Sequence, residues 1–239
     1  DGGKYINKDD IIAQTKKMLE EGASIIDIGA QSSRPGSQVI SAEQELITLL
    51  PIVKLLKTEI PDIIISIDTF WAKTAQECVQ LGADVINDIS AGEMDDTMFD
   101  TIAKLEVPYI IMHMKGTPKS MQENPSYNEV IAEIILYFKK KIKTLTTKGI
   151  EQIIIDPGFG FGKTLEHNYK ILSNLEEFKQ FNIPVLVGTS RKSMIYKLLD
   201  GEPKDSLNGT SITNTMALQK GVSILRVHDV KAAIECIKI

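Results

Sequence analysis

The feature that most limits the possible folds of this chain is a unit that recurs four times. In each copy a helical stretch ends at a glycine, and a short run rich in Ile and Val follows: MLEEGASIIDIG, CVQLGADVINDI, LTTKGIEQIIID and ALQKGVSILRVH. The glycines, Gly22, Gly82, Gly149 and Gly221, suit the left-handed C-cap of a helix. A helix that ends in this way before an apolar strand is half of a βαβ unit, so the sequence predicts a repeated βαβ organisation.

Three further runs predict strands of the same kind: IIISID (63–68), VPYIIMH (107–113) and IPVLVG (183–188). Together with the four repeats they make seven expected strands. Their nearly continuous apolar character is typical of strands buried on both faces, which occur in parallel sheets covered by helices. The predicted class is therefore α/β.

Polar residues at the ends of these strands favour a closed barrel over an open sheet. Carboxylates, amides and basic groups stand at or near the C-terminal end of the expected strands: Asp27, Asp68, Asn87, Asp88, His113, Asp156, Arg226 and His228. In a (β/α)8 TIM barrel this end of every strand faces the active site, whereas an open sheet would leave the outer groups far apart. Because only seven strands are expected and the chain opens with the loop DGGKYINKDD, we expect the first strand and most of its loop to lie upstream. Residues 1–239 are then one N-terminally incomplete barrel domain.

Composition restricts the class of partner. The net charge is −5 and the sequence pI is about 5.4, which argues against a dedicated nucleic-acid binder and favours a small molecule. The two cysteines, Cys78 and Cys236, have no metal-ligand spacing, so we interpret them as buried small hydrophobes in a reducing compartment, the cytoplasm. No apolar run approaches a membrane span, and no leader is expected. The basic run at 138–148 is interpreted as a solvated helix end.

The stretch IIIDPGFGFGKTLEHN (153–168) nearly spells a phosphate-binding P-loop. Pro157 occupies the position where that pattern requires glycine, and it has no N–H to offer a phosphate. The remaining interpretation is a strand that ends in the carboxylate of Asp156, followed by a glycine-rich turn that allows close approach of the backbone.

Each of the acidic and amide candidates has a plain structural alternative. Asp68 could cap a helix as readily as bind a ligand, Asn87 could hold a turn, and Asp156 before Pro157 could form one. Their convergence at the ends of barrel strands favours a binding pocket. Buried carboxylates need donors, and a planar heterocycle with ring N–H and amino groups would supply them.

Basic residues gather in SRKS (190–193) and LRVHDV (225–230), after the last two expected strands. In barrels this corner often binds phosphate, and Arg has the fork geometry for it. Arg226 and His228, two residues apart, are expected on one side of a strand; the alternative is that these cations pair with a nearby carboxylate. The loop SSRPGS (32–37), around Arg34, is interpreted as a mobile lid. His113 and His167 are weaker candidates.

Seven ordered motifs, IDIGAQSSRPG, SIDTF, GADVINDISAG, MHMKGTP, DPGFGFGKT, SRKS and RVHDV, resemble those of the dihydropteroate synthase family over essentially the whole chain. The resemblance implies condensation of 6-hydroxymethyl-7,8-dihydropterin diphosphate with 4-aminobenzoate to dihydropteroate and pyrophosphate, a transferase reaction of folate biosynthesis and a sulfonamide target. The chain departs from many members at Ser33, where they have Thr, and at Ala30-Gln31, where they have Gly-Glu.

The same resemblance implies roles for individual residues. Arg34 and Lys192 are the expected catalytic residues, and the cofactor is Mg²⁺, held on the diphosphate with help from an Asn upstream of this chain rather than by a metal ligand within it. A cytoplasmic homodimer is implied, with no nucleic acid or membrane partner. The alternatives are a non-catalytic pterin-binding fragment and a methyltetrahydrofolate-dependent methyltransferase. The resemblance assigns Asp68, Asn87, Asp156 and Lys192 to the pterin, Arg226 and His228 to the diphosphate, Phe161 and Ser193 to the aminobenzoate, and Ser33 with Arg34 to the closing loop.

Overall fold

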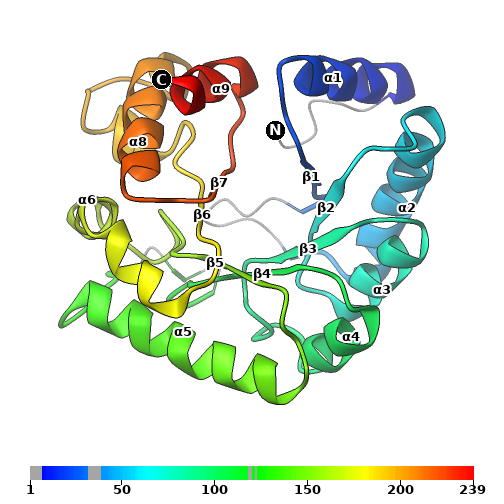
Figure 1. Cartoon of the computed structure of the whole chain (residues 1–239), viewed down its shortest axis with the longest axis horizontal. Coiled ribbons are helices and arrows are strands. Elements are labelled where there is room, and N and C mark those ends of the chain that lie inside the picture. Colours follow the sequence, from blue (N-terminus) through cyan, green and yellow to red (C-terminus); the bar gives the residue numbers. More distant parts are fainter. Residues whose placement is uncertain (1–6, 32–38, 118–119, 122) are drawn as a thin grey trace. The chain divides into compact units, whose positions relative to one another are not determined.

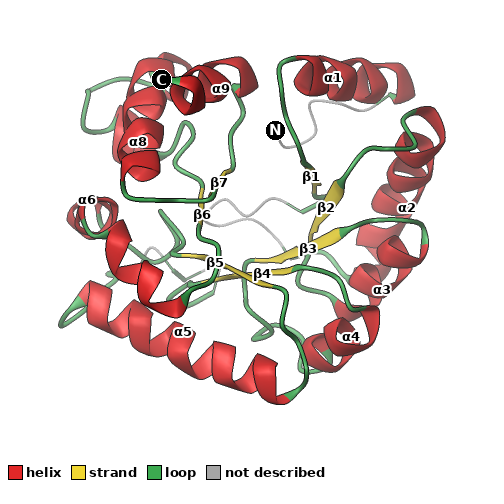
Figure 2. Ribbon diagram, viewed as in Figure 1, coloured by secondary structure: helices red, strands yellow, loops and turns green. Residues whose placement is uncertain are grey.

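The structure, a computed structural model, describes residues 7–31, 39–117, 120–121 and 123–239. Within these residues strands alternate with helices along the chain (Figure 1), and Figure 2 shows that most of the regular structure is helical. The strands are β1 (Ile26–Ile28), β2 (Ile65–Asp68), β3 (Val85–Asp88), β4 (Tyr109–Met112), β5 (Ile153–Asp156), β6 (Leu186–Val187) and β7 (Ile224–Leu225). The α-helices are α1 (Lys8–Glu20), α2 (Ala42–Glu59), α3 (Ala72–Gln80), α4 (Met98–Leu105), α5 (Val130–Thr147), α6 (Leu165–Ser173), α7 (Ser193–Tyr196), α8 (Leu207–Gln219) and α9 (Val230–Lys238), and two 3-10 helices span η1 (Leu175–Phe181) and η2 (Pro203–Asp205).

The predicted βαβ organisation is confirmed. The strands form one sheet in the order β1-β2-β3-β4-β5 and a second in which β6 lies beside β7. The β1–β2, β2–β3, β3–β4 and β6–β7 pairs are parallel. The glycines that end the repeated helices all have positive φ, as the left-handed C-cap requires: Gly22, Gly82, Gly149 and Gly221.

The chain divides into two compact units, each with its own core. Unit 1 comprises Asp1–Ile111 with Lys143–Ile153, and unit 2 comprises Met112–Ile142 with Ile154–Ile239. The expectation that residues 1–239 form one domain stays a prediction.

In unit 1 the register of the sheet brings polar strand ends together. Ile65, Ile67 and Ile86 are fully buried in its centre. Asp68, the last residue of β2, lies beside Asn87 in β3. The apolar residues therefore fix the strands, and the C-terminal edge of the sheet carries the carboxylate and amide groups.

In unit 2 the core joins α5 to the 3-10 helix η1. Phe138 and Phe178 are fully buried, and their ring centroids lie 6.2 Å apart in an edge-to-face arrangement. Ile155 of β5 bridges to Val185 in parallel, and the β6–β7 register pairs Val187 with Leu225. These short strands place the segments after β5, β6 and β7 in one unit.

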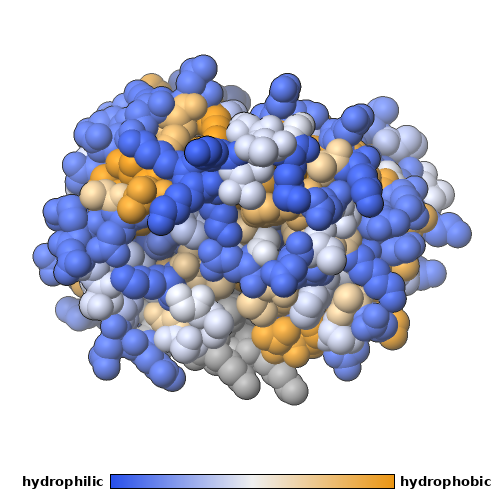
Figure 3. Space-filling model, turned by 90° about the horizontal axis from the view of Figure 1, so that it is seen from below, coloured by the Kyte–Doolittle hydropathy of each residue, from blue (hydrophilic) through white to orange (hydrophobic). Residues whose placement is uncertain are grey.

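The surface agrees with most of the sequence interpretation. The face in Figure 3 is mainly hydrophilic, with apolar side chains in small groups. Exposed Lys139, Lys140 and Lys143 lie in the second half of α5, so the basic run is a solvated helix end as expected. Cys78 is buried, but the expectation for Cys236 is wrong: it is only partly buried, because α9 leaves its thiol near the edge of α8, 3.5 Å from the Ser211 carbonyl. In the described part of the chain, no helix is both long and apolar enough to cross a membrane.

Candidate functional site

The first group of predicted site residues lies at the strand ends of unit 1. Asn87 is 5% exposed, and its side-chain amide donates to Asp27 at the middle of β1, with Nδ2 3.2 Å from Oδ2. Asp68 stands beside Asn87 in the sheet, and a Cβ at Gly29 would come within 3.1 Å of the Asp68 Cβ. Three strands thus bring two carboxylates and one amide close to each other.

The capping alternative for Asp68 is not needed, because other side chains cap α3. The Trp71 N–H donates to Thr69 Oγ1 at 3.1 Å, and the Ala72 N–H donates to Asp95 Oδ2 at 2.8 Å. The sequence therefore places Asp68 at the end of a strand without requiring it to start the next helix.

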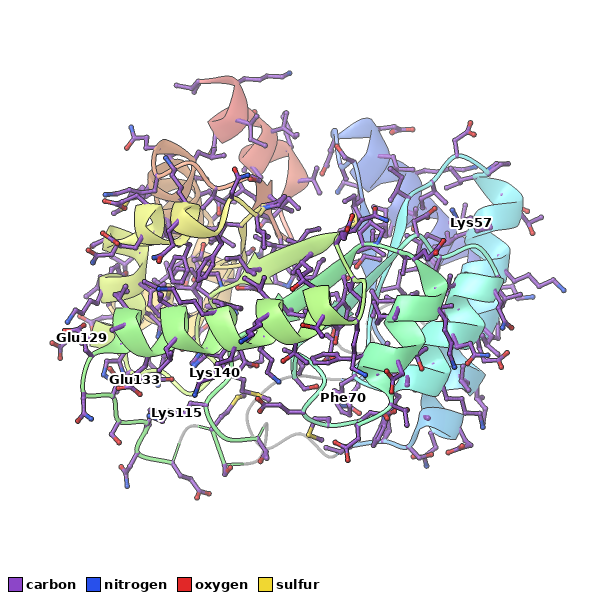
Figure 4. The ribbon with its side chains drawn as sticks, turned by 60° about the horizontal axis from the view of Figure 1, so that its bottom comes forward. Lys57, Phe70, Lys115, Glu129, Glu133 and Lys140 are labelled. Atoms are coloured by element: carbon purple, nitrogen blue, oxygen red, sulfur yellow. The ribbon has the colours of Figure 1, made fainter. Side chains whose placement is uncertain are left out.

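A buried glutamate that sequence reasoning missed lies behind Thr69. Glu45, in the first turn of α2, is 1% exposed and accepts from the Thr69 hydroxyl at 2.5 Å. Burial raises the pKa of Glu45, and the hydrogen bond from Thr69 opposes that rise. In the sequence, Glu45 differs from other charged residues only in standing next to the apolar Leu46, and this signal is too weak to predict that it is buried. A small pocket in this unit is lined by Gln31, Glu45, Asp68, Thr69, Phe70 and Ile89, and Figure 4 labels Phe70.

Asp88, the neighbour of Asn87, has a structural role. Its carboxylate accepts from the Ser90 N–H and hydroxyl at 2.7 Å each, from the Gly92 N–H at 2.8 Å and from the Tyr109 hydroxyl at 2.6 Å. It is fully buried, and this burial raises its pKa. Because its carboxylate already accepts four hydrogen bonds, Asp88 stabilises the turn after β3. Its neighbour Asn87 instead contacts Asp27.

The second group lies in unit 2 and begins with Asp156 at the end of β5. One carboxylate oxygen accepts from the Gly158 N–H at 2.8 Å, so the turn-forming alternative is correct for that oxygen. Burial raises the pKa of Asp156, while Lys192, Lys163 and Arg226 lower it. A carboxylate with cations around it and an apolar setting is suited to accept from N–H donors of a ligand.

Lys192 reaches over the glycine-rich turn from the segment after β6. Its Nζ donates to the Phe159 carbonyl at 2.5 Å and lies 4.7 Å from the centroid of the Phe161 ring. Phe161 is partly buried, and Ser193 begins α7 as an exposed residue. The structure therefore brings Lys192 and Phe161 together, with an aromatic face beside a cation.

Beneath the same turn lies Lys163, which sequence reasoning did not single out. Lys163 is 3% exposed, and its Nζ contacts His113 at the end of β4. The sequence signal was present in the Gly-Lys pair, but it was weighed only as part of a P-loop. His113 is buried, and this lowers its pKa to about 2, so its ring is neutral.

The basic corner is organised by one ion pair and one hydroxyl. Arg191 binds Asp229 through both its Nε and Nη2, at 2.8 and 2.6 Å. Ser190 Oγ accepts from the His228 N–H at 3.2 Å and lies 2.9 Å from its Nδ1. The alternative that a carboxylate nearby neutralises the cations applies to Arg191.

Arg226 and His228 are both exposed at this corner. Arg226 and His228 were expected on one side of a strand, but β7 ends at Leu225. The Arg226 N–H still donates to the Val187 carbonyl. The backbone then turns, and the His228 N–H donates to Ser190 Oγ. Partial burial and the neighbouring Arg226 and Arg191 cations lower the pKa of His228. An exposed guanidinium and an imidazole beside a hydroxyl form a site to which an anion has access.

Three candidate residues remain. Ser33 and Arg34, with the lid interpretation of SSRPGS, lie outside the described residues. His167, one of the two weaker candidates, lies in α6, where its Nδ1 accepts from the Thr164 N–H and completes a capping box at the start of that helix.

Unit 1 therefore carries carboxylates and an amide near the ends of parallel strands, and unit 2 carries a strand-end carboxylate, an aromatic residue beside a lysine, and an exposed basic corner. The chain matches the family model described as pterin binding enzyme over residues 1–228. It therefore belongs to the pterin-binding enzyme family, and its function is that of a dihydropteroate synthase, a transferase of folate biosynthesis.

Individual relatives support this assignment. The dihydropteroate synthase of Haemophilus influenzae is 42% identical over 241 residues, a match that covers 100% of this chain and 87% of the relative. That of Escherichia coli strain K12 is 40% identical and is covered to 85%. The alternatives of a methyltransferase and of a non-catalytic fragment are not favoured by these relatives.

Solved structures show the same fold. The Yersinia pestis dihydropteroate synthase in complex with a sulfonamide drug has a TM-score of 0.96 and 38% identity, covering 100% of this chain and 86% of that one. The Xanthomonas albilineans enzyme with 4-aminobenzoic acid has a TM-score of 0.91 and 34% identity, covering 100% and 85%. The expected fold class, the (β/α)8 barrel, is therefore confirmed.

Proposed function

We propose that the residues assigned by the sequence carry out the condensation of 6-hydroxymethyl-7,8-dihydropterin diphosphate with 4-aminobenzoate. The observation that carries this proposal is Asp156: it is a carboxylate at a strand end, with one oxygen held by the Gly158 N–H and with Lys192 and Lys163 as cationic neighbours. The other oxygen can accept from pterin N–H and amino groups. Asp68 and Asn87 are proposed to bind the pterin as well.

The basic corner is proposed to hold the diphosphate. Arg226 supplies a guanidinium, His228 an imidazole and Ser190 a hydroxyl, and Arg191 fixes the segment by its bidentate pair with Asp229. A bound diphosphate would raise the pKa of His228, because it opposes the cations that now lower it.

The aminobenzoate is proposed to lie against Phe161, with Ser193 beside it and Lys192 between the two substrates. Lys192 already contacts the ring of Phe161, so one cation can serve both sites. Because the Xanthomonas albilineans relative was solved with 4-aminobenzoic acid and the Yersinia pestis relative with a sulfonamide drug, this chain is proposed to bind both kinds of arylamine here.

Chemistry then needs no strong base. The bond between the pterin methylene carbon and the bridging oxygen breaks, pyrophosphate leaves with the electron pair, the amine nitrogen attacks the carbon, and its proton passes to solvent. Cations stabilise the leaving diphosphate, and Phe161 and Lys192 position the amine. Ser33 and Arg34 are proposed to belong to the loop that closes over the site, with Arg34 as the second catalytic residue.

Mg²⁺ remains a proposal that rests on the family resemblance. Among the residues that the structure describes, no group of three or more His, Cys, Asp or Glu could hold a metal ion. The described residues of the basic corner do not fit a magnesium site either, since its carboxylate, Asp229, is bound to Arg191.

The assembly and location are also proposals. Large apolar side chains are exposed on and near α8, and they are suited to the interface of a homodimer: Leu198, Leu199, Leu207, Ile212 and Met216. The cytoplasm is proposed because the two cysteines are free.

Calorimetry on two variants tests the residue assignment. Asp156→Asn should lose pterin binding while its unfolding transition is retained, because each charge-assisted bond is worth roughly 1.5–3 kcal/mol. Arg226→Ala should weaken pterin diphosphate and free pyrophosphate but leave bare hydroxymethylpterin unaffected. Unchanged pterin affinity in the first variant, or an equal loss for all three ligands in the second, would contradict the assignment.

A further inference from the structure

Lys163 is a buried cation that the proposed reaction does not use. Only 3% of the residue is exposed, and such a group must find acceptors because an unpaired buried ammonium is very costly. Its Nζ lies 2.7 Å from the Gly158 carbonyl, 3.0 Å from the Phe161 carbonyl and 3.1 Å from both the carbonyl oxygen and the Nδ1 of His113. Three backbone carbonyls match the three N–H groups of an ammonium.

These acceptors come from two segments. His113 follows β4, whereas Gly158 and Phe161 are the first and last residues of the turn after β5, which is closed by a bond from the Phe161 N–H to the Gly158 carbonyl at 3.2 Å. Backbone groups in an irregular turn lack the partners that a strand or helix provides, and a buried side chain can supply them. The amine of Lys163 does this and ties the turn to the end of β4.

The glycines show how closely the turn lies on that strand end. A Cβ at Gly158 would come within 2.0 Å of the His113 carbonyl oxygen, and one at Gly162 within 2.4 Å of the Lys115 carbonyl oxygen. The Tyr127 hydroxyl donates to the Gly162 carbonyl at 2.8 Å. Lys115 in turn contacts Glu133, and Figure 4 shows both near the start of α5. The turn is therefore packed against His113 and Lys115 and bonded to Tyr127.

The opposite face of the turn carries Lys192. Its Nζ binds the Phe159 carbonyl and lies over the Phe161 ring, while a Cβ at Gly160 would lie 3.7 Å from its Cδ. One lysine thus holds the buried face of the turn and another lies on its accessible face. A displacement of Phe161 by even 1 Å would be felt in arylamine binding, because aromatic contacts depend on geometry.

The buried position of Lys163 also changes its pKa. Burial lowers the pKa of Lys163 well below its ordinary value, with Asp156 opposing and Lys192 adding to the effect. The His113 ring is neutral, and its Nδ1 lies 3.1 Å from the Lys163 Nζ.

We propose that Lys163 is a positioning residue, whose amine clamps the Gly158–Phe161 turn onto the end of β4 and so sets where the Phe161 ring meets the arylamine substrate. This inference rests on the proposed role of Phe161 at the aminobenzoate site, and the test separates the two.

The test is steady-state kinetics on Lys163→Met, which keeps the apolar stem and removes the N–H groups. Its KM for 4-aminobenzoate and its Ki for a sulfonamide should rise about tenfold or more, the effect of one or two lost hydrogen bonds, while the KM for pterin diphosphate changes far less. Lys197→Met, on the exposed surface, is the matched control and should match the wild type. If Lys163→Met does not fold, Lys163→Gln, which retains two N–H donors, takes its place.

Phe161→Ala distinguishes the possible failures. If it raises the aminobenzoate KM and the Lys163 variant does not, the clamp is refuted and the substrate assignment stands. If Phe161→Ala has no effect, the assignment itself is wrong. A fluorine NMR signal from fluorophenylalanine at position 161, identified by Phe161→Leu, should be single in the wild type and shifted or broadened in Lys163→Met. An unchanged signal would also overturn the proposal.

Discussion

Replacing Gly158 by alanine is a sensitive test of how the DPGFGFGKT turn is built. Gly158 has φ +75°, and an added Cβ would lie 2.0 Å from the His113 carbonyl oxygen. The left-handed conformation alone costs an alanine roughly 1–2 kcal/mol. The steric contact requires the turn to move away from the strand end by about 1 Å or more, since non-bonded heavy atoms are stable only near 3.5 Å.

That movement has a second cost, because the turn and the strand end share Lys163. Its Nζ binds Gly158 on one side and His113 on the other, so separation of the two breaks one of these bonds. A hydrogen bond to a charged group contributes about 1.5–3 kcal/mol. Gly158→Ala should therefore lower the free energy of unfolding by about 2.5–5 kcal/mol, the sum of the two terms.

Two glycines provide matched controls. Gly160, in the same turn, has φ +87° and its nearest neighbour for a Cβ is the flexible end of Lys192 at 3.7 Å. Gly149 has φ +81° and nothing within 4 Å. Both alanine variants carry the conformational cost without the steric one, so each should lose only about 1–2 kcal/mol.

Urea denaturation followed by circular dichroism measures all three variants, and the aminobenzoate KM reports on the turn itself. Gly158→Ala should be the least stable and should bind aminobenzoate poorly even below its unfolding transition. If Gly158→Ala loses no more stability than Gly160→Ala, the close packing of the turn on the His113 carbonyl is not rigid, and the reasoning fails.

Three further predictions concern the core, the pH response and the basic corner. Phe138→Ala should cost about 3–5 kcal/mol in urea denaturation with substrate KM values unchanged, because the ring is fully buried; a loss below 1 kcal/mol would contradict this. The pKa of His113 is about 2 in the folded protein and 6.5 ordinarily, so between these values the unfolded chain binds one more proton than the folded chain. The free energy of unfolding should therefore decrease as the pH is lowered from 6.5 toward 2. His113→Gln should flatten that slope by about 1.4 kcal/mol per pH unit, and an unchanged slope would refute it. Asp229→Asn, which releases Arg191, should weaken pyrophosphate binding in calorimetry but not the binding of bare hydroxymethylpterin.

Much of the fold could be predicted from the sequence, because the signals are local and repeated. A helix that ends at a glycine and an apolar run that follows specify a βαβ unit without long-range information, and all seven expected strands are present in the described residues. Their lengths were overestimated: IPVLVG predicted a strand over 183–188, but β6 spans only Leu186–Val187. An apolar run shows what is buried, whereas strand ends depend on which backbone groups find a partner.

Candidate site residues could be proposed from the sequence where a polar residue stands at the end of an expected strand. Asp68, Asn87 and Asp156 were recognisable because each is a polar group directly after an apolar run. Glu45 and Lys163 were not, since a helix and a loop full of polar residues give no sign of which one turns inward. Their burial follows from tertiary contacts, with Thr69 for one and with the His113 carbonyl for the other.

The glycine-rich turn resembles a P-loop in sequence, but the hydrogen bonds of its backbone groups are not suited to phosphate binding. In a P-loop the backbone N–H groups point at the phosphate. Here the Gly158 N–H is bound to Asp156 and the Gly160 N–H to Asn168, while the turn's carbonyls point at lysine amines. Since these N–H groups are committed to side-chain oxygens, this turn cannot supply them to an anion. This agrees with the proposal that side chains bind the diphosphate, and in unit 2 the proposed residues stand after β6 and β7, at Ser190, Arg226 and His228. Gly158 and Gly162 serve close packing, and we propose that Asp156 and Phe161 are the groups of this segment that contact substrates.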